Sequence, residues 1–298
     1  HADLMRQALA ELDEVDLLGA IPRDEELQIP ERHLGLHTAG ERTLPQKYIH
    51  KLGRALEENV DLDGLLAQIA APVEGPASER ETAQSGVRLG VAADDAFSFY
   101  YRDNLDRLEA LGAELVEFSP VRDPLPEGLD GVYLGGGYPE VAAADLSANR
   151  AFFRGIVDFI ESGGPVYAEC GGLMVLGRWI ETDKGERYQM AGVFPWGTRM
   201  ADGPKLDYAE VETAAQTPIF PAGATARGHI FHYSEIAEEP DEESLRRCYH
   251  VEPLREEPFR EGYAHRNVLA SYVHLHFGSN PAFARSLIEA CQEYAASR

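Results

Sequence analysis

Short apolar runs alternate with longer amphipathic segments between residues 87 and 180, and this alternation constrains the fold more than any other feature. Apolar runs of four to six residues indicate strands, and apolar residues at helical spacing indicate helices. We predict strands at 87–92, 114–118, 131–134 and 164–168, and helices at 100–111, 151–162 and 173–180. Such alternation is typical of an α/β fold, a mostly parallel sheet covered by helices.

A cysteine, Cys170, ends one of the predicted strands and directly precedes two glycines. This arrangement is typical of a sharp strand-to-helix turn, where the N–H groups at the start of the helix favour a thiolate. The glycines leave room for an approaching substrate, as at the nucleophile of many hydrolases. A buried structural cysteine is the alternative, but the glycines and histidines around Cys170 favour a nucleophile.

Three glycines, Gly135 to Gly137, directly follow the strand predicted at 131–134. In parallel sheets ligands bind at the carboxyl ends of the strands, so we expect this turn to lie near Cys170. Glycine backbone can turn its N–H groups toward an oxyanion. Taken alone a triple glycine more often forms an ordinary turn, but beside Cys170 it predicts an oxyanion hole.

Two pairs of histidines stand near the end of the chain, at 229 and 232 and at 274 and 276. His274 and His276 alternate along a predicted strand and therefore share one side of it. One of them can act as the base for a thiol, because imidazole has a pKa near neutrality. Neither pair has the spacing of a zinc site, so we predict no metal, and we interpret His229 and His232 as core or substrate-contacting histidines.

Residues 94–104 combine acidic residues with an aromatic cluster that includes Tyr101. This stretch is either the start of a helix with a hydrophobic face or a docking surface for a flat, polar substrate. The sequence does not favour one over the other.

The charge of the chain limits its partners. Its 298 residues carry 51 acidic and 27 basic side chains, a formal net charge of −24. This field repels phosphate backbones and anionic lipids, so we expect neither nucleic acid nor a membrane as partner. The three cysteines form neither a disulfide framework nor a metal motif, and we find no signal peptide or transmembrane run, so we expect a cytoplasmic protein.

The composition changes once, at 71–86, where Pro, Gly and charged residues replace helical periodicity, as in a linker. Before it we predict helices at 2–12 and within 46–69 and one strand at 15–21. Because one strand cannot form a sheet, we interpret this segment as the end of a larger domain, or as an appendage of the second one. We find no Walker A motif for ATP in the sequence.

Four motifs, at 135–140, 167–174, 228–234 and 271–277, resemble in this order the glutamine amidotransferase domain of cobyrinic acid a,c-diamide synthases. Residues 18–36 resemble the end of the ATP-dependent synthetase domain of the same family. The resemblance implies a class I glutamine amidotransferase-like domain at 87–298, a linker at 73–86, and at 1–72 the C-terminal remnant of a P-loop synthetase domain. We therefore expect the chain to be a fragment.

By this resemblance Cys170 is the nucleophile of a Cys-His glutaminase site and His274 its base. The same resemblance implies oxyanion and glutamine-binding donors at Gly136, Gly137 and Gly171. As possible substrate contacts we name His229, His232, Tyr101 and His276. His276 stands where related amidotransferases carry a Glu that orients the histidine. The chain therefore resembles a Cys-His dyad.

The resemblance implies a ligase of cobalamin biosynthesis. Ammonia from glutamine would amidate the a and c carboxylates of cobyrinic acid, with ATP and Mg²⁺ bound at a P-loop that this chain lacks. Expected partners are glutamine and a corrinoid or related tetrapyrrole, and a homodimer stays open. Alternatives are a diamide synthase for hydrogenobyrinic acid or a nickel tetrapyrrole, a non-catalytic binding module, and a thiol hydrolase or peptidase. The motif at 135–140 disfavours cobyric acid synthase.

Overall fold

The computed structural model describes residues 1–12, 15–28, 45–70, 86–214, 217–237 and 245–298. The chain divides into two compact units, His1–Glu79 and Arg80–Arg298. Within the described ranges no helix is both long and apolar enough to span a bilayer.

The regular elements described in the first unit are helices. It contains α1 (Ala2–Leu9), the short 3₁₀ helix η1 (Glu25–Leu27), α2 (Gln46–Asn59) and α3 (Leu62–Ile69), and its α-helices bury none of their residues fully. The strand predicted at 15–21 is wrong, because within this described segment only Gly19 pairs, in an isolated bridge with Val60. The predicted linker at 73–86, apart from Gly86, lies outside the described residues.

A twelve-stranded sheet forms the second unit, with a main strand order of β12-β8-β7-β9-β10-β11-β4-β3-β1-β2. Its strands are β1 (Arg88–Ala92), β2 (Glu114–Phe118), β3 (Gly131–Leu134), β4 (Val166–Glu169), β5 (Trp179–Glu181), β6 (Arg187–Gln189), β7 (Gly197–Thr213), β8 (Thr225–Ile236), β9 (Arg246–Pro253), β10 (Phe259–His265), β11 (Val268–Ser271) and β12 (Val273–His276). The helices are α4 (Arg102–Ala110), α5 (Ala143–Ala148), α6 (Arg150–Glu161), α7 (Gly171–Leu176), α8 (Ala282–Ser297) and the 3₁₀ helix η3 (Phe277–Ser279).

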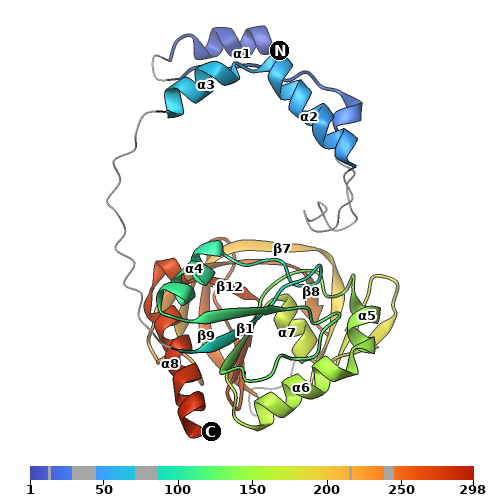
Figure 1. Cartoon of the computed structure of the whole chain (residues 1–298), viewed down its shortest axis with the longest axis vertical. Coiled ribbons are helices and arrows are strands. Elements are labelled where there is room, and N and C mark those ends of the chain that lie inside the picture. Colours follow the sequence, from blue (N-terminus) through green and yellow to red (C-terminus); the bar gives the residue numbers. More distant parts are fainter. Residues whose placement is uncertain (13–14, 29–44, 71–85, 215–216, 238–244) are drawn as a thin grey trace. The chain divides into compact units, whose positions relative to one another are not determined.

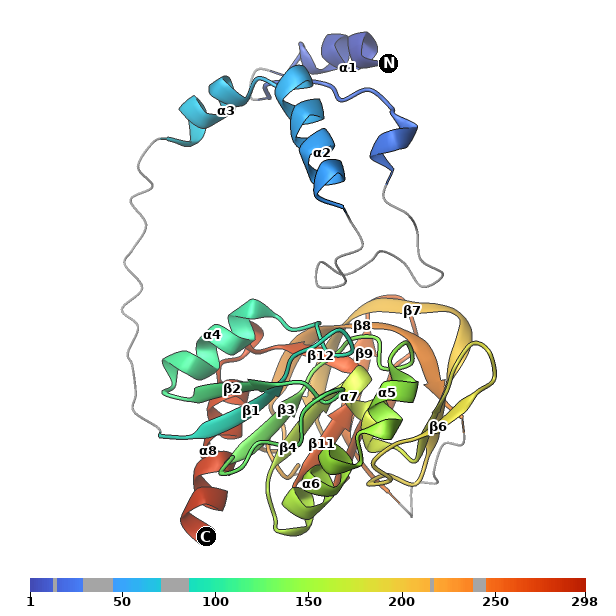
Figure 2. The same ribbon diagram turned by 45° about the vertical axis from the view of Figure 1, so that its right-hand side comes forward.

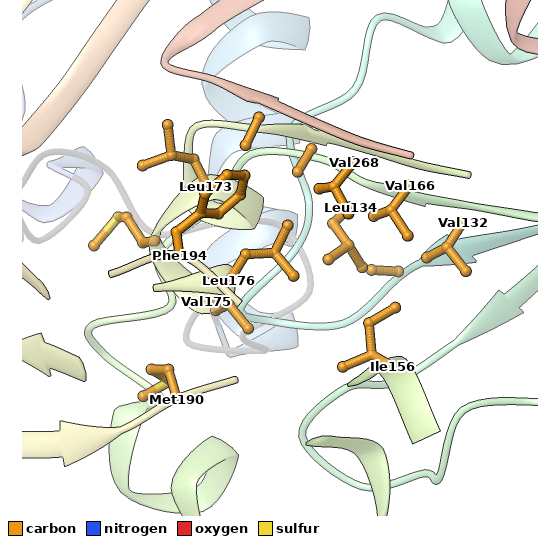
Figure 3. Close-up of a cluster of buried hydrophobic side chains, with 14 of the residues drawn as sticks. Val132, Leu134, Ile156, Val166, Leu173, Val175, Leu176, Met190, Phe194 and Val268 are labelled. Atoms are coloured by element: carbon orange, nitrogen blue, oxygen red, sulfur yellow. The ribbon is translucent and has the colours of Figure 1, made fainter. Parts of the chain in front are cut away.

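The parallel part of the sheet runs from β2 through β1, β3 and β4 to β11, and helices cover both of its faces (Figures 1 and 2). Side chains alternate between the faces, because successive residues of a strand point to opposite sides. On β3, Val132 and Leu134 pack in one core cluster with Ile156 of α6, as Figure 3 shows, whereas Tyr133 belongs to a second cluster. Because both faces of these strands are buried, the strands appear in the sequence as continuous apolar runs.

The predicted α/β class is confirmed, and the strands at 114–118 and 131–134 have the predicted bounds. Beyond β11 the sheet continues through antiparallel pairs from β10 to β7 and β8. The helix predicted at 173–180 is partly wrong. It begins at Gly171 and ends at Leu176, and the residues from Trp179 onward form β5, which pairs with β6 and β7.

Strands β11 and β12 form one nearly continuous run that changes partners. β11 pairs with β4 and β10, and after the single residue Tyr272 the run continues as β12, which pairs with β8. The N–H of Cys170, directly after β4, donates a 2.7 Å hydrogen bond to the carbonyl of Ser271. The change of partners therefore occurs beside the cysteine, and it brings His274 into the same region.

Candidate active site

Cys170 occupies the turn between β4 and α7 with φ 48° and ψ −97°. A positive φ is unfavourable for a residue with a side chain, at a cost of about 1–3 kcal/mol, and such residues concentrate at functional sites. Hydrogen bonds at both ends hold the residue there: its N–H donates to Ser271, and its carbonyl accepts from the N–H of Met174 at 3.1 Å. The turn is the strand-to-helix turn that the sequence predicts.

The thiol of Cys170 faces a small cavity of about 20 Å³. Its Sγ lies 3.7 Å from the carbonyl oxygen of Phe231 on β8. The cavity is lined by Phe99, Gly137, Tyr138, Glu140, Cys170, Met174, Met200, Phe231, His232, Tyr233 and Ser234. This volume is about that of one water molecule, so an amino acid can enter only when the lining residues move.

Burial raises the pKa of the Cys170 thiol to about 12. The carboxylates of Glu140 and Glu169 add to the rise, whereas the backbone N–H groups of Gly171 and Gly137 oppose it by hydrogen-bonding the sulfur. The expectation that the turn favours a thiolate is therefore wrong for this buried thiol. The helix N–H groups act in the expected direction, but they are outweighed by desolvation of the charged form.

The glycine turn after β3 contacts both candidate catalytic residues. A Cβ on Gly136 would collide with Cε1 of His274, and a Cβ on Gly137, which has φ 157°, would collide with the carbonyl oxygen of Ala96. The N–H of Gly136 donates to the carbonyl of Phe99 at 3.1 Å, so it is already engaged. Of the three predicted oxyanion donors, the N–H groups of Gly137 and Gly171 face the sulfur.

His274 lies in the middle of β12, opposite His229 on β8. The two imidazole rings stack, with centroids 4.5 Å apart and planes 6° apart. His274 is 3 % exposed, and its Nε2 has no hydrogen-bond partner among the described residues. Burial, with smaller contributions from His229 and His232, lowers its pKa to about 3, so the ring is neutral. The expectation of a pKa near neutrality is wrong because the sequence does not show this burial.

The CobB/CobQ-like glutamine amidotransferase domain family matches residues 88–282. The chain belongs to this family. It is 42% identical to the cobyrinate a,c-diamide synthase of Syntrophotalea carbinolica over 98% of this chain, and 39% identical to that of Dehalococcoides mccartyi over 97%. These matches span 65% and 64% of the two relatives, so the chain corresponds to about two thirds of their length.

The fold of the amidotransferase unit has a solved counterpart. A Thermoplasma acidophilum protein assigned as a GMP synthase subunit superposes with a TM-score of 0.50, over 71% of this chain and 96% of the other. The two are 18% identical, so the likeness concerns the fold alone.

Three of the four possible substrate contacts in this amidotransferase domain lie together, and the fourth, His232, lies apart from them. The hydroxyl of Tyr101 lies 2.6 Å from Nδ1 of His229, and its ring meets that of His276 edge to face at 4.8 Å. Nε2 of His276 lies 3.4 Å from the carboxylate of Asp103, toward the surface. Tyr101 and His229 line a separate cavity of about 430 Å³. His276 is thus connected to His274 through Tyr101 and His229.

His232 belongs to the cysteine's surroundings instead. It lines the Cys170 cavity and also an adjacent cavity of about 360 Å³. Its ring stacks on Tyr272 at 4.0 Å, and its Nδ1 lies 2.6 Å from the carbonyl of Ser234. Burial lowers the pKa of His232 to about 4. Among the residues that the structure describes, no three His, Cys, Asp or Glu side chains are grouped to hold a metal.

Sequence reasoning missed three buried polar residues that support the site. Glu169 precedes Cys170, Asn104 lies on α4, and Glu261 on β10 accepts 2.5 Å hydrogen bonds from Ser271 Oγ and the N–H of Tyr272. A signal existed for Glu169, because a charged residue in the last position of a buried strand must have partners. Nothing local marks Asn104 or Glu261.

Proposed function

We propose that this chain is the glutamine-hydrolysing part of a cobyrinate a,c-diamide synthase, with Cys170 as nucleophile and His274 as base. One observation carries the proposal: the sulfur of the strained Cys170 meets the N–H groups of Gly137 and Gly171, and the same glycine turn, at Gly136, packs against the buried, neutral ring of His274. A neutral imidazole can accept a proton, and two N–H groups can stabilise an oxyanion.

The proposed reaction begins when glutamine displaces residues that line the cavity. His274 accepts the thiol proton as Sγ of Cys170 bonds to the side-chain carbonyl carbon of glutamine. The charge that develops on the carbonyl oxygen is held by the N–H groups of Gly137 and Gly171. His274 then donates its proton to the departing nitrogen, which leaves as ammonia, and a thioester remains.

Water completes the cycle. His274 removes a proton from the water that attacks the thioester carbonyl, and glutamate leaves as the C–S bond breaks. The sulfur recovers its proton from His274, and the site returns to the neutral thiol and imidazole. Proton and electron counts balance without a redox partner.

The names of the relatives support cobyrinate as the acceptor of the ammonia, at its a and c carboxylates. The described residues do not fit ATP. None of the four lysines, at positions 47, 51, 184 and 205, follows a phosphate-binding loop. Lys51 is also engaged by Asp24 and Glu26, and Lys205 by Glu256. A hydrogenobyrinic acid or nickel tetrapyrrole acceptor fits the same glutaminase chemistry.

Ammonia release from glutamine tests the proposal. We expect turnover by the chain and none by Cys170→Ala, and we expect a glutamine-analogue electrophile, 6-diazo-5-oxo-L-norleucine, to add covalently to Cys170 as measured by peptide mass. Equal turnover by both proteins would show that Cys170 is not the nucleophile. If neither protein releases ammonia, labelling decides: absence of the adduct on Cys170 would contradict the proposal, and its presence would support it.

A further inference from the structure

Among the described strands, β12 has no neighbour along its outer edge, although the residues there are buried. β12 pairs on one side with β8 and ends the main strand order of the sheet. Leu275 is 0 % exposed, so its backbone N–H and carbonyl cannot reach water. Buried backbone groups need partners, and here two side chains provide them in place of a strand.

Glu169 and Asn104 are these two side chains. Oε1 of Glu169 accepts a 2.9 Å hydrogen bond from the N–H of Leu275. The side-chain amide of Asn104 donates to the carbonyl of Leu275 at 2.7 Å, and its oxygen accepts from the N–H of Phe277 at 2.7 Å. Together these two side chains fix the position of the β12 backbone along its edge away from β8.

The carboxylate of Glu169 is itself held in one orientation. Tyr167 donates its hydroxyl to Oε1 at 2.6 Å, and Tyr133 donates to Oε2 at 2.7 Å. Both tyrosines are 0 % exposed and Glu169 is 1 % exposed, so no water competes for these bonds. A carboxylate that accepts hydrogen bonds at both oxygens, in an interior without competing water, is held rigidly in one position.

Glu169 connects the segments that carry the two residues of the proposed dyad. Glu169 directly precedes Cys170 in sequence, and Leu275 directly follows His274. One hydrogen bond therefore joins the neighbour of the thiol to the neighbour of the imidazole. The bond from the N–H of Cys170 to the carbonyl of Ser271 is a second tie between the same two segments. We propose that Glu169 is a positioning residue that sets His274 relative to Cys170, an inference that rests on the proposed function.

An electrostatic role in activating the thiol does not explain Glu169. Its negative charge raises the pKa of Cys170, the opposite of what would promote a thiolate. Burying the carboxylate is also unfavourable, since burial raises its own pKa to about 7. The geometric role accounts for both observations, because only an acceptor of this shape completes the hydrogen bonding of Leu275 and both tyrosines.

The test compares three variants. Glu169→Met keeps the approximate size of the side chain but has no acceptor for Leu275. Glu169→Gln keeps an acceptor oxygen, and its amide can donate to a tyrosine hydroxyl. Asp130→Asn is the matched control, because Asp130 is also a buried carboxylate but precedes β3, at the end of that strand opposite to the glycine turn. The readouts are kcat and KM for glutamine hydrolysis, the rate of Cys170 labelling by 6-diazo-5-oxo-L-norleucine, and the melting temperature.

We expect Glu169→Met to lower kcat and the labelling rate by about 100-fold, the size of effect that misplacement by about 1 Å produces, while KM changes little. Glu169→Gln should recover most of that loss. Asp130→Asn should lower the melting temperature but leave kcat unchanged. If Glu169→Met does not fold, the double variant Tyr133→Phe Tyr167→Phe replaces it, and we expect a smaller fall in kcat because the carboxylate is freed to turn.

Wild-type kcat or labelling in folded Glu169→Met would overturn the positioning role, as would an effect confined to KM or a Glu169→Gln protein as impaired as Glu169→Met. In the double variant, wild-type kcat and labelling would overturn it as well. Failure of the proposed function looks different: Cys170→Ala then keeps its ammonia release, or Cys170 takes up no label, whatever the Glu169 variants do. Labelling needs no turnover, so the test applies even when the chain alone hydrolyses glutamine slowly.

Discussion

The imidazole of His229 lies flat against that of His274, with 4.5 Å between the ring centroids. His229 comes from β8 and His274 from β12, at directly opposed positions of an antiparallel pair. Tyr101 hydrogen-bonds the far ring, so a row of aromatic side chains leads from the proposed base to the 430 Å³ cavity. The stack shields His274 from water on one face, and it explains part of the low pKa of that ring.

The first prediction concerns pH. With a pKa of about 3, His274 stays neutral well below the ordinary histidine pKa of about 6.5, so kcat/KM for glutamine should show no loss at pH 6.5 that is due to His274. Burial is the main cause of the low pKa of His274, and His229→Phe keeps that burial but removes the imidazole that lowers the pKa further. The acidic limb of the kcat/KM profile of this variant should therefore move slightly to higher pH. The pH–rate profile measures this. His250→Phe, at a partly exposed histidine of β9, is the control and should leave the profile unchanged.

The second prediction concerns the strained turn. Cys170→Ala and Cys170→Gly both remove the sulfur, but only glycine adopts φ 48° without steric penalty. We expect Cys170→Gly to be more stable than Cys170→Ala by about 1 kcal/mol, as measured by urea unfolding. Equal stabilities would mean that the turn stores no strain.

The third prediction concerns the contact between the glycine turn and the base. A methyl group on Gly136 would collide with the His274 ring, so Gly136→Ala should displace that ring and lower kcat by about 100-fold in a folded protein. Gly203→Ala is the matched control, because a Cβ at Gly203 meets no described atom within 4 Å. Comparable kcat values for the two variants would show that the position of His274 is not critical.

The fourth prediction concerns stability and pH. Burial raises the pKa of both Glu169 and Glu261 to about 7, above the unfolded value near 4.5. Between these values each of the two carboxyl groups binds more protons in the folded than in the unfolded state, so their contribution to the free energy of unfolding falls as pH rises from about 4.5 to 7. In Glu169→Gln this fall should be smaller by a few kcal/mol at most. Urea unfolding at pH 5, 6, 7 and 8 checks it, and parallel curves for wild type and variant would contradict it.

The sequence predicts what depends on local pattern. The strands at 114–118 and 131–134 and the turn at Cys170 follow from apolar runs and glycines, which reflect burial on both faces of a parallel sheet. The helix predicted through residue 180 fails because a short apolar run suits a buried helix or a strand equally well, and pairing with β6 and β7 decides for a strand at Trp179.

The candidate site, like the fold, can be predicted only in part from the sequence. Cys170, His274 and the glycine turn can be identified from their motifs, and their proximity follows from the topology. The protonation states of Cys170 and His274 cannot be predicted from these motifs, because desolvation by residues far away in the sequence sets their pKa values. Likewise, the engagement of the Gly136 N–H depends on Phe99, which sits 37 positions earlier. Asn104 and Leu275 meet across 171 residues, beyond any local signal.

The small cavity around Cys170 has a consequence for the proposed hydrolysis of glutamine. A thiol in a space the size of one water molecule is out of reach of free glutamine until Met200, Phe231 or their neighbours move aside. For the proposed reaction, the rate at which these residues move aside is an upper limit on the rate at which Cys170 attacks glutamine.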